Sequence, residues 1–200
     1  MRRPGLIALL VATVLAQWAV PGSLIWKSER ILAEGKPFRF RTRPVDPADL
    51  FRGRYVAIGV ERDTVDLDRI PAEGEFRRGS VLYASLAVDA SGFAYPAALT
   101  PAPPLGTDAI RVRVGWVNRQ PGIEAEDILD ARARVSIEYP FSRYYASEKT
   151  APRLERAVLN PQLLRQGETW VTVRVLGGDA VIEDLFIAGR PAREYREGSK

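Results

Sequence analysis

The sequence contains no cysteine and no histidine among its 200 residues. Without cysteine there is no disulfide framework, no thiolate metal ligand and no thiol nucleophile. Without histidine there is no imidazole general base, so Ser-His-Asp and Cys-His catalytic arrangements are excluded, together with most transition-metal sites. We therefore expect neither a resident metal nor a cofactor, and no catalytic residue is assigned.

Lysine is also scarce, and no lysine falls inside a predicted buried strand. A catalytic lysine must lose its hydration to act as a base near neutral pH, so a Ser-Lys hydrolase is disfavoured. The enzymatic alternative is an envelope hydrolase that uses paired carboxylates, such as Asp46 and Asp49. A helix cap and a first-turn charge explain this pair more simply. The net charge of +4 is far from that of a dedicated nucleic-acid-binding protein.

What the sequence does have is a long apolar segment near its start. From Gly5 to Trp26, only Gln17 and Ser23 are clearly polar. At about 1.5 Å of rise per residue, a helix of this length crosses a bilayer core of about 30 Å. Arg2 and Arg3 predict a cytoplasmic N-terminus, which places the rest of the chain on the other side of the membrane. We therefore expect membrane lipid to contact residues 5–26.

Two other interpretations of this segment stay open. Val14-Leu15-Ala16 is similar to a signal-peptidase site, so residues 1–16 would be removed as a cleaved signal. Alternatively, the segment is a buried core helix, because its apolar character runs all round and not along one stripe.

The remainder of the chain alternates polar and apolar residues with the two-residue period of half-buried strands. This pattern predicts strands at residues 37–42, 55–61, 80–88, 93–99, 109–117, 131–139, 168–176 and 180–187. Asp89–Gly92 and Gly177–Asp179 are the predicted hairpin turns, and the prolines of Pro96–Thr107 predict a loop. One helix is expected after Thr150 as its N-cap, ending before Pro161.

The expected fold class is therefore mainly β. We predict an N-terminal transmembrane helix in residues 1–28, a β-rich domain in residues 36–190 and a polar, frayed tail in residues 191–200. The β-rich domain should form an antiparallel β-sandwich or a partly open barrel with one short helix.

Four arginines alternate with apolar residues in two of the predicted strands. In residues 109–117, Trp116 is expected on the core face with the aliphatic side chains. If this strand pairs with residues 131–139, one exposed face carries four basic side chains: Arg111, Arg113, Arg132 and Arg134. Such a face contributes about 1 kcal/mol per basic residue beside an anionic surface, so an anionic-lipid-contacting domain is a second alternative. The plainer interpretation is a solvated face whose arginine stems cover apolar surface.

The stretch before residues 55–61 predicts a sharp corner. Asp46 is a good N-cap, and Pro47 suits the first helical position. Gly53 stands where a short helix needs a left-handed exit. We therefore expect one or two helical turns over Pro47–Arg52, followed by a buried strand.

This corner also resembles a known family. DPADLFRG from Asp46 to Gly53, followed by RYVAIGV from Arg54 to Val60, is similar to the GDYXXLXY family of bacterial membrane-anchored proteins. Gly53 and Tyr55 match the defined letters, and Ile58 replaces the leucine. Arg54 and Val60 replace the aspartate and the last tyrosine, so chemistry that requires the motif aspartate is in doubt. The motif residues carried over are Asp46, Asp49, Arg52, Gly53, Tyr55 and Ile58.

A second similarity lies further along the chain, where the family tends to carry a Glu-Arg-Tyr-aromatic cluster before a helix. The matching residues are Glu138, Arg143, Tyr144 and Tyr145. They would form either a patch that recognises a partner or a structural ion pair beneath aromatic rings.

The resemblance implies a single-pass protein of the bacterial inner membrane, with its C-terminal domain in the periplasm and no assigned catalytic residues. It also suggests partnership with multi-pass membrane proteins. We therefore expect a non-catalytic, tethered domain that binds a membrane-protein or envelope partner and no nucleic acid, while the sequence leaves the oligomeric state open.

Overall fold

The computed structural model describes residues 4–43, 55–119, 133–147, 150–160, 162 and 169–194. Within these residues the chain forms a long helix, α1 (Pro4–Glu34), a short helix, α2 (Ala151–Val158), and the strands β1 (Lys36–Arg43), β2 (Tyr55–Ala57), β3 (Gly59–Val60), β4 (Thr64–Asp66), β5 (Val81–Val88), β6 (Ala94–Thr100), β7 (Ala109–Arg119), β8 (Ala133–Glu138), β9 (Arg143–Tyr145), β10 (Thr169–Leu176), β11 (Asp179–Ile187) and β12 (Arg190–Pro191). The helix expected over Pro47–Arg52 lies outside the described residues.

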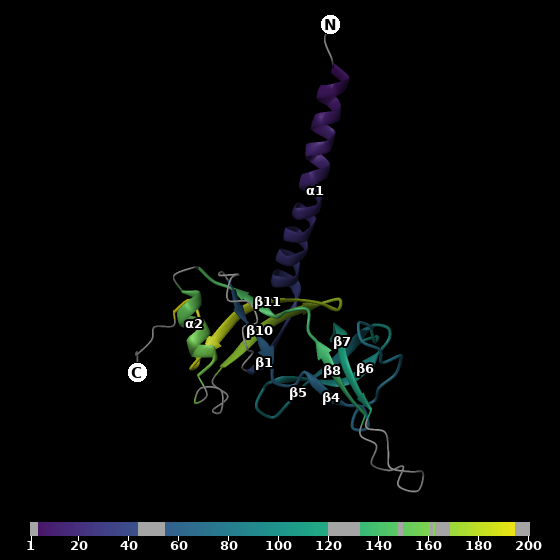
Figure 1. Ribbon diagram of the computed structural model, residues 1–200, viewed down its shortest axis with the longest axis vertical. Coiled ribbons are helices and arrows are strands. Elements are labelled where there is room, and N and C mark those ends of the chain that lie inside the picture. Colours follow the sequence, from purple (N-terminus) through teal and green to yellow (C-terminus); the bar gives the residue numbers. More distant parts are fainter. Residues whose placement is uncertain are drawn as a thin grey trace.

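The strands form two five-stranded sheets and one two-stranded sheet. The orders are β12-β11-β10-β1-β3, β4-β8-β7-β5-β6 and β2-β9, and neighbouring strands within each sheet are antiparallel. Together they make a nearly closed, barrel-like body with few helices (Figure 1). The expected mainly β, antiparallel fold is confirmed.

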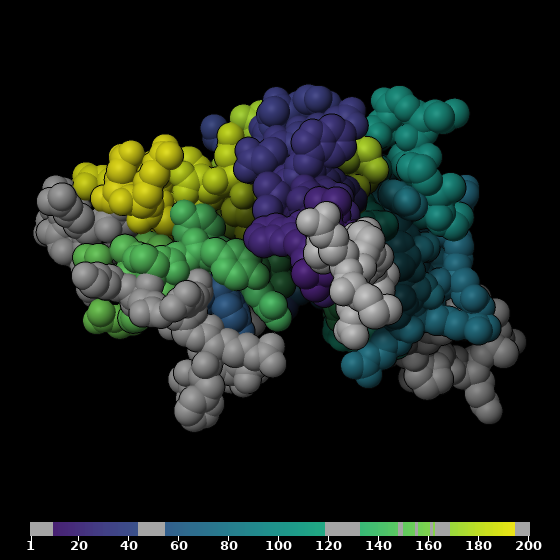
Figure 2. All heavy atoms as spheres, turned by 90° about the horizontal axis from the view of Figure 1, so that it is seen from above, coloured from purple at the N-terminus to yellow at the C-terminus, as the bar shows by residue number. Residues whose placement is uncertain are grey.

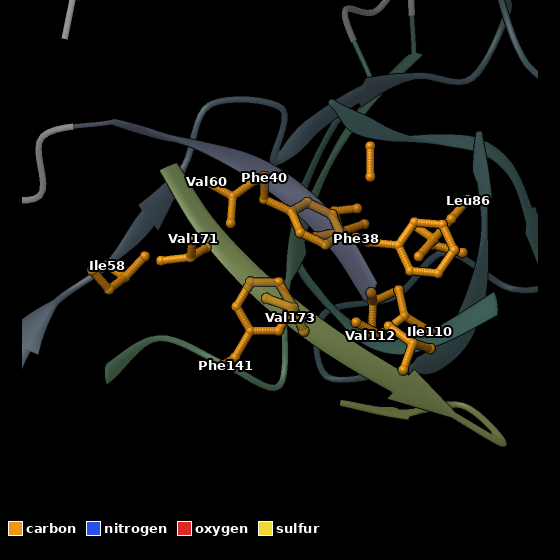
Figure 3. Close-up of a cluster of buried hydrophobic side chains, with 14 of the residues drawn as sticks. Phe38, Phe40, Ile58, Val60, Leu86, Ile110, Val112, Phe141, Val171 and Val173 are labelled. Atoms are coloured by element: carbon orange, nitrogen blue, oxygen red, sulfur yellow. The ribbon is translucent and has the colours of Figure 1, made fainter. Parts of the chain in front are cut away.

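The core is centred on β1 and β10, which pair over six residues from Lys36↔Val175 to Arg41↔Trp170. The alternation of β1 turns Phe38 and Phe40 inward, where both are buried. Phe38 points toward the side chains of the second sheet, while the ring of Phe40 lies 5.1 Å from that of Phe141 (Figure 3). Burying a side chain of this size stabilises the fold by about 1.5–3 kcal/mol.

Two sequence predictions fail where a strand contains a bulge. The strand predicted over residues 93–99 is confirmed as β6 and includes Pro96, so the loop predicted from Pro96 starts too early. Strand β6 is an edge strand whose neighbour in the sheet is β5, and its register shifts beside Leu86↔Pro96. Edge strands and bulges are the places where a sheet tolerates proline. Likewise, β7 shifts register between Val114 and Val117, so Trp116 is 48% exposed and does not face the core. An extra residue in a strand reverses the facing of the next side chain.

The predicted hairpin between β10 and β11 is confirmed. The turn residues Gly177 and Gly178 have φ of 59° and 88°, the left-handed conformations that a two-residue turn between twisted strands requires. The short helix is confirmed as well: α2 follows Thr150 and buries Leu154 and Val158 against the core. Pro161 lies outside the described residues.

Helix α1 rises from the body as a separate rod (Figure 1). Seen from above in Figure 2, it stands between the green segment that includes α2 on one side and the teal segments that include β5 and β6 on the other. Judged on the described part of the chain, none of the helices reaches the length and hydropathy of a bilayer-spanning segment.

The apolar side chains of α1 from Leu10 to Trp26 are exposed, which contradicts the interpretation of this segment as a buried core helix. Leu10, Leu15, Trp18 and Trp26 all lie on the surface. Burial begins at Ile31, near the end of the helix. A helix that projects beyond the sheets has no core to enter.

Helix α1 and β1 are separated by Gly35 alone. The Gly35 N–H donates to the Ile31 carbonyl over 2.8 Å, and the Arg174 guanidinium donates to the Gly35 carbonyl over 3.1 Å. Lys27 and Asp179 add an ion pair of 2.7 Å. These contacts fix the end of the helix to the β10–β11 hairpin.

The other end of the chain stays packed past the expected start of the tail. Pro191 pairs with Phe186, and the Ala192 N–H donates to the Leu185 carbonyl over 2.7 Å. Ala192 is buried. Residues 195–200 lie outside the described part.

Candidate functional site

The two stretches that carry the family resemblance meet in the small sheet of β2 and β9. Tyr55 pairs with Tyr145, Val56 with Tyr144, and Ala57 with Arg143. The pairing continues beyond β2, because the Ile58 N–H donates to the Ser142 carbonyl over 2.9 Å.

This pairing creates an aromatic and basic cluster on the surface. The rings of Tyr55 and Tyr145 lie 6.4 Å apart in an edge-to-face arrangement, and the Arg143 guanidinium lies 5.0 Å from the centre of the Tyr55 ring. Tyr145 is nevertheless 73% exposed. We call Tyr55, Arg143 and Tyr145 the aromatic cluster. Cation–π contacts at exposed sites contribute about 0.5–1 kcal/mol, which holds the rings in place without removing them from solvent.

The GDYXXLXY family model matches residues 17–185, which covers most of the chain, including both strands of this sheet. The chain belongs to the GDYXXLXY family. No curated protein and no solved structure gives a match.

The GDYXXLXY motif therefore divides between surface and core. Tyr55 belongs to the aromatic cluster, whereas Ile58 and Val60 are buried. The apolar replacement Val60 suits a core position that a tyrosine hydroxyl would occupy only with a hydrogen-bond partner. Asp46, Asp49, Arg52 and Gly53 lie outside the described residues.

A groove of about 460 Å³ opens beside the aromatic cluster. One wall is the segment Pro140–Tyr145, which includes β9, and the other is Ala180–Ile182 at the start of β11. We call it the β9–β11 groove. Its volume falls within the range of clefts that hold small ligands or short peptide segments.

A second hollow of about 470 Å³ shares Pro140 with this groove. It contains three of the residues predicted from the sequence, namely Arg111, Arg113 and Glu138. Six of the predicted residues thus line two adjoining hollows: Arg143, Tyr144 and Tyr145 the first, and Arg111, Arg113 and Glu138 the second.

Strands β7 and β8 do pair, and Arg111, Arg113 and Arg134 are exposed. The register spreads them, however, because Arg113 lies opposite Glu138, and Arg134 lies opposite Asn118. Arg111 forms an ion pair of 2.9 Å with Asp179. Arg132 lies outside the described residues.

The predicted pair of Glu138 and Arg143 is not an ion pair among the described residues. Glu138 sits across from a β7 arginine, and Arg143 packs on a tyrosine ring. The β8–β9 connection separates the two side chains into adjacent hollows, so their closeness in sequence was misleading.

Asp184, which sequence analysis missed, supports the inner side of the groove. The Tyr144 hydroxyl donates to Asp184 Oδ1 over 3.2 Å, and that oxygen also accepts the Leu185 N–H over 2.9 Å. Burial, together with the charge and hydrogen bond of Asp184, raises the pKa of Tyr144 to about 12. Tyr144 is therefore a neutral hydrogen-bond donor at physiological pH. No local pattern in the sequence links a tyrosine to an aspartate in a distant strand.

The carboxylates near the groove are engaged in structural contacts. Asp179 is shared by Lys27 and Arg111, and Asp184 accepts hydrogen bonds from Tyr144 and the backbone. Among the described residues, no group of acidic side chains is arranged to hold a metal ion. The chemistry that the groove offers is hydrogen bonding, ring contact and one arginine charge.

Proposed function

We propose that this protein is a single-pass membrane protein whose β-rich domain lies outside the cytoplasm, on the periplasmic face of the bacterial inner membrane, and binds a second membrane protein without performing catalysis. The binding surface is the aromatic cluster with the β9–β11 groove. The observation that carries this proposal is the exposed Tyr145 beside Arg143 and Tyr55, where both family-specific stretches meet.

The amphipathic nature of the cluster supports binding. Tyrosine and arginine are among the residues that contribute most to protein interfaces, because they bury a large area and still form polar contacts. A folded domain gains little from leaving a ring such as Tyr145 in water.

The composition of α1 supports the membrane anchor. The sequence from Gly5 to Trp26 contains no charged residue, and the exposed side chains from Leu10 onward are largely apolar. Leaving such a surface in water costs about 25 cal/mol for each Å² of apolar area. Arg2 and Arg3 favour a cytoplasmic N-terminus, and Trp18 and Trp26 suit membrane interfaces.

The arginine contacts favour a protein partner over a lipid surface. Asp179 offsets the charge of Arg111, and Arg113 faces Glu138 across the strands. The four-arginine face proposed from the sequence therefore lacks the concentration of positive charge that anionic headgroups would select.

The orientation can be tested with single cysteines, because the chain has none of its own. Leu105 is 99% exposed, so Leu105→Cys should react with a membrane-impermeant maleimide in spheroplasts. Arg3→Cys should react only after the membrane is broken. Labelling of both, or only of Arg3→Cys, in intact spheroplasts would contradict the proposed orientation.

Partner binding can be tested by replacing Tyr145 with a photo-crosslinking amino acid in the full chain in bacterial cells. We expect a discrete product with a multi-pass membrane protein, and loss of that product when Arg143→Glu is added. The matched control is the same amino acid at Leu105, which is exposed and does not line the groove. Absence of a product at Tyr145, or an identical product at Leu105, would contradict the proposal.

A further inference from the structure

The start of β11 is an open strand edge along one wall of the groove. Strand β11 pairs with β10 from Asp179 to Ile187, but β12 pairs with it only at Phe186 and Ile187. Among the described residues, no strand is hydrogen-bonded to the outer side of Asp179–Ile182, although β7 bridges the preceding residue, Gly178. An uncovered edge of this kind is a template for an added strand.

The register identifies which backbone groups face outward. The tight turn makes Leu176↔Asp179 the first hydrogen-bonded pair of the hairpin. Hydrogen-bonded and non-hydrogen-bonded pairs alternate in an antiparallel ladder, so Val181 bonds toward β10 while Ala180 and Ile182 direct their N–H and C=O groups outward. Within the described part of the chain, these outward groups have no backbone partner. They are about 6.8 Å apart, the two-residue repeat of a strand.

The opposite wall supplies specificity. Arg143, Tyr144 and Tyr145 line the groove across from this edge. Arg143 forms a ring contact with Tyr55 but no ion pair with any described carboxylate. A segment lying in the groove would therefore gain most from an acidic side chain directed toward Arg143.

The position of the edge indicates where its occupant comes from. Asp179, the first residue of β11, is held by Lys27, which directly follows Trp26 and the apolar segment. If α1 spans the membrane as proposed above, the edge begins close to the membrane surface. The occupant should then be a stretch that leaves the membrane nearby.

We propose that the β9–β11 groove binds an extended juxtamembrane segment of another membrane protein, which adds as a short strand to the outer edge of β11 and places an acidic side chain against Arg143. This proposal rests on the proposed function and specifies how its partner is held. The added strand can be only a few residues long. The β11 ladder is interrupted by a bulge at Glu183, and from Phe186 onward the same edge is occupied by β12.

Ala180 allows a selective test of strand addition. Ala180→Pro removes an outward N–H without removing a hydrogen bond to β10, and proline is tolerated on strand edges. Ala180→Val keeps the N–H and is the matched control. The probe is a random-sequence library of short peptides displayed on phage and selected against the full chain in lipid nanodiscs.

We expect the selected peptides to share an acidic residue, and to bind Ala180→Pro at least about tenfold more weakly than the unchanged chain or Ala180→Val. Arg143→Glu should weaken binding as well. In the unchanged chain, a bound peptide should slow hydrogen exchange at the Ala180 and Ile182 amides, and this measurement decides the question if Ala180→Pro does not fold.

Failure to enrich any peptide, equal binding to Ala180→Pro and Ala180→Val, or unchanged exchange at both amides would each overturn strand addition. The crosslinking experiment separates this failure from failure of the proposed function. If the crosslinked product from position 145 persists in Ala180→Pro but disappears in Arg143→Glu, the partner binds the groove without adding a strand. The absence of any product overturns both proposals.

Discussion

The β1–β10 pair and the β2–β9 pair are both antiparallel and rich in aromatic residues, yet they place those residues in opposite environments. In β1–β10 a six-residue register buries Phe38 and Phe40 inside the body. In β2–β9 a three-residue register leaves Tyr55 and Tyr145 edge to face at the surface with Arg143.

The two pairs differ in how much of the hydrophobic core surrounds their rings. The long pair has aliphatic side chains from both five-stranded sheets around its rings, as Figure 3 shows for Phe38 with Leu86 and Ile110. The short pair lies at the margin of the body, where its inner side reaches the core through Val56 and the partly buried Tyr144. A short strand pair can therefore present its outer side chains to a partner at little cost to the fold.

The largest effect should come from the long pair. Phe40→Ala removes a fully buried ring that contacts Tyr139 and Phe141. We expect a loss of about 3–5 kcal/mol in the free energy of unfolding, because a large cavity forms in a closed part of the core. Urea denaturation of the purified full chain would measure this loss. A cost as small as that of Tyr145→Ala would remove the contrast between the two pairs.

Substitutions in the β10–β11 hairpin, which follows the long pair, should cost less stability, and the cost should differ strongly between its two glycines. A Cβ on Gly178 would lie 2.9 Å from Cε1 of Tyr83, at a φ of 88°, whereas a Cβ on Gly177 meets open space at a φ of 59°. We expect Gly178→Ala to cost about 2–3 kcal/mol and Gly177→Ala about 1 kcal/mol. Thermal unfolding of the two variants in parallel measures the difference, and equal costs would show that Tyr83 moves aside freely.

The short pair should show the reverse pattern, with a small change in stability and a large change in binding. For Tyr145→Ala we expect a change in unfolding free energy within about 0.5 kcal/mol, because the side chain is mostly in solvent. A photo-crosslinking residue at Ser142, on the wall of the β9–β11 groove, should lose most of its product in this variant. Destabilisation by several kcal/mol together with undiminished crosslinking would assign the aromatic cluster to folding.

The smallest expected effect is on the pH dependence of stability. It distinguishes Tyr144, on the inner side of the short pair, from Tyr55 and Tyr145 on its outer side. Below pH 10 both the folded and the unfolded chain keep the Tyr144 proton, so Tyr144 makes no contribution to the pH dependence of stability there. Between its ordinary pKa of 10 and its folded pKa of about 12, the unfolded chain loses the proton first, and stability falls as the pH rises. Tyr144→Phe should make this fall shallower but not flat, because burial also raises the pKa of Tyr139. Unfolding curves across this pH range measure the slope, and identical slopes would contradict the role of Asp184.

Local patterns in the sequence were sufficient for most strands and for the β10–β11 turn. Alternation along residues 37–42 indicated β1 because two phenylalanines and two arginines define its faces without ambiguity. Gly177 and Gly178 indicated the hairpin because few other residues accept two successive left-handed conformations. Trp116 was misplaced because a bulge shifts the facing of a strand without leaving a mark in its polarity pattern. The loop was predicted to start too early, at Pro96, because proline was taken as a break in regular structure, whereas an edge strand with a bulge tolerates it.

The candidate site was only partly accessible from sequence. Arg143, Tyr144 and Tyr145 were identified, but their pairing with the Tyr55 strand joins segments far apart in the chain, and a period of two does not specify a partner. Strands β2 and β9 are also too short for alternation to define their faces. Asp184 was missed because its role depends on a hydroxyl that the fold brings to it.

The joint at Gly35 has a mechanical consequence. With no spacer between helix and sheet, and with Arg174 bonded to the joint itself, the rod and the body should turn as one piece. A change in the tilt of α1 would then swing the proposed binding surface through the same angle without altering its shape, and the tilt would decide which neighbouring proteins that surface can reach.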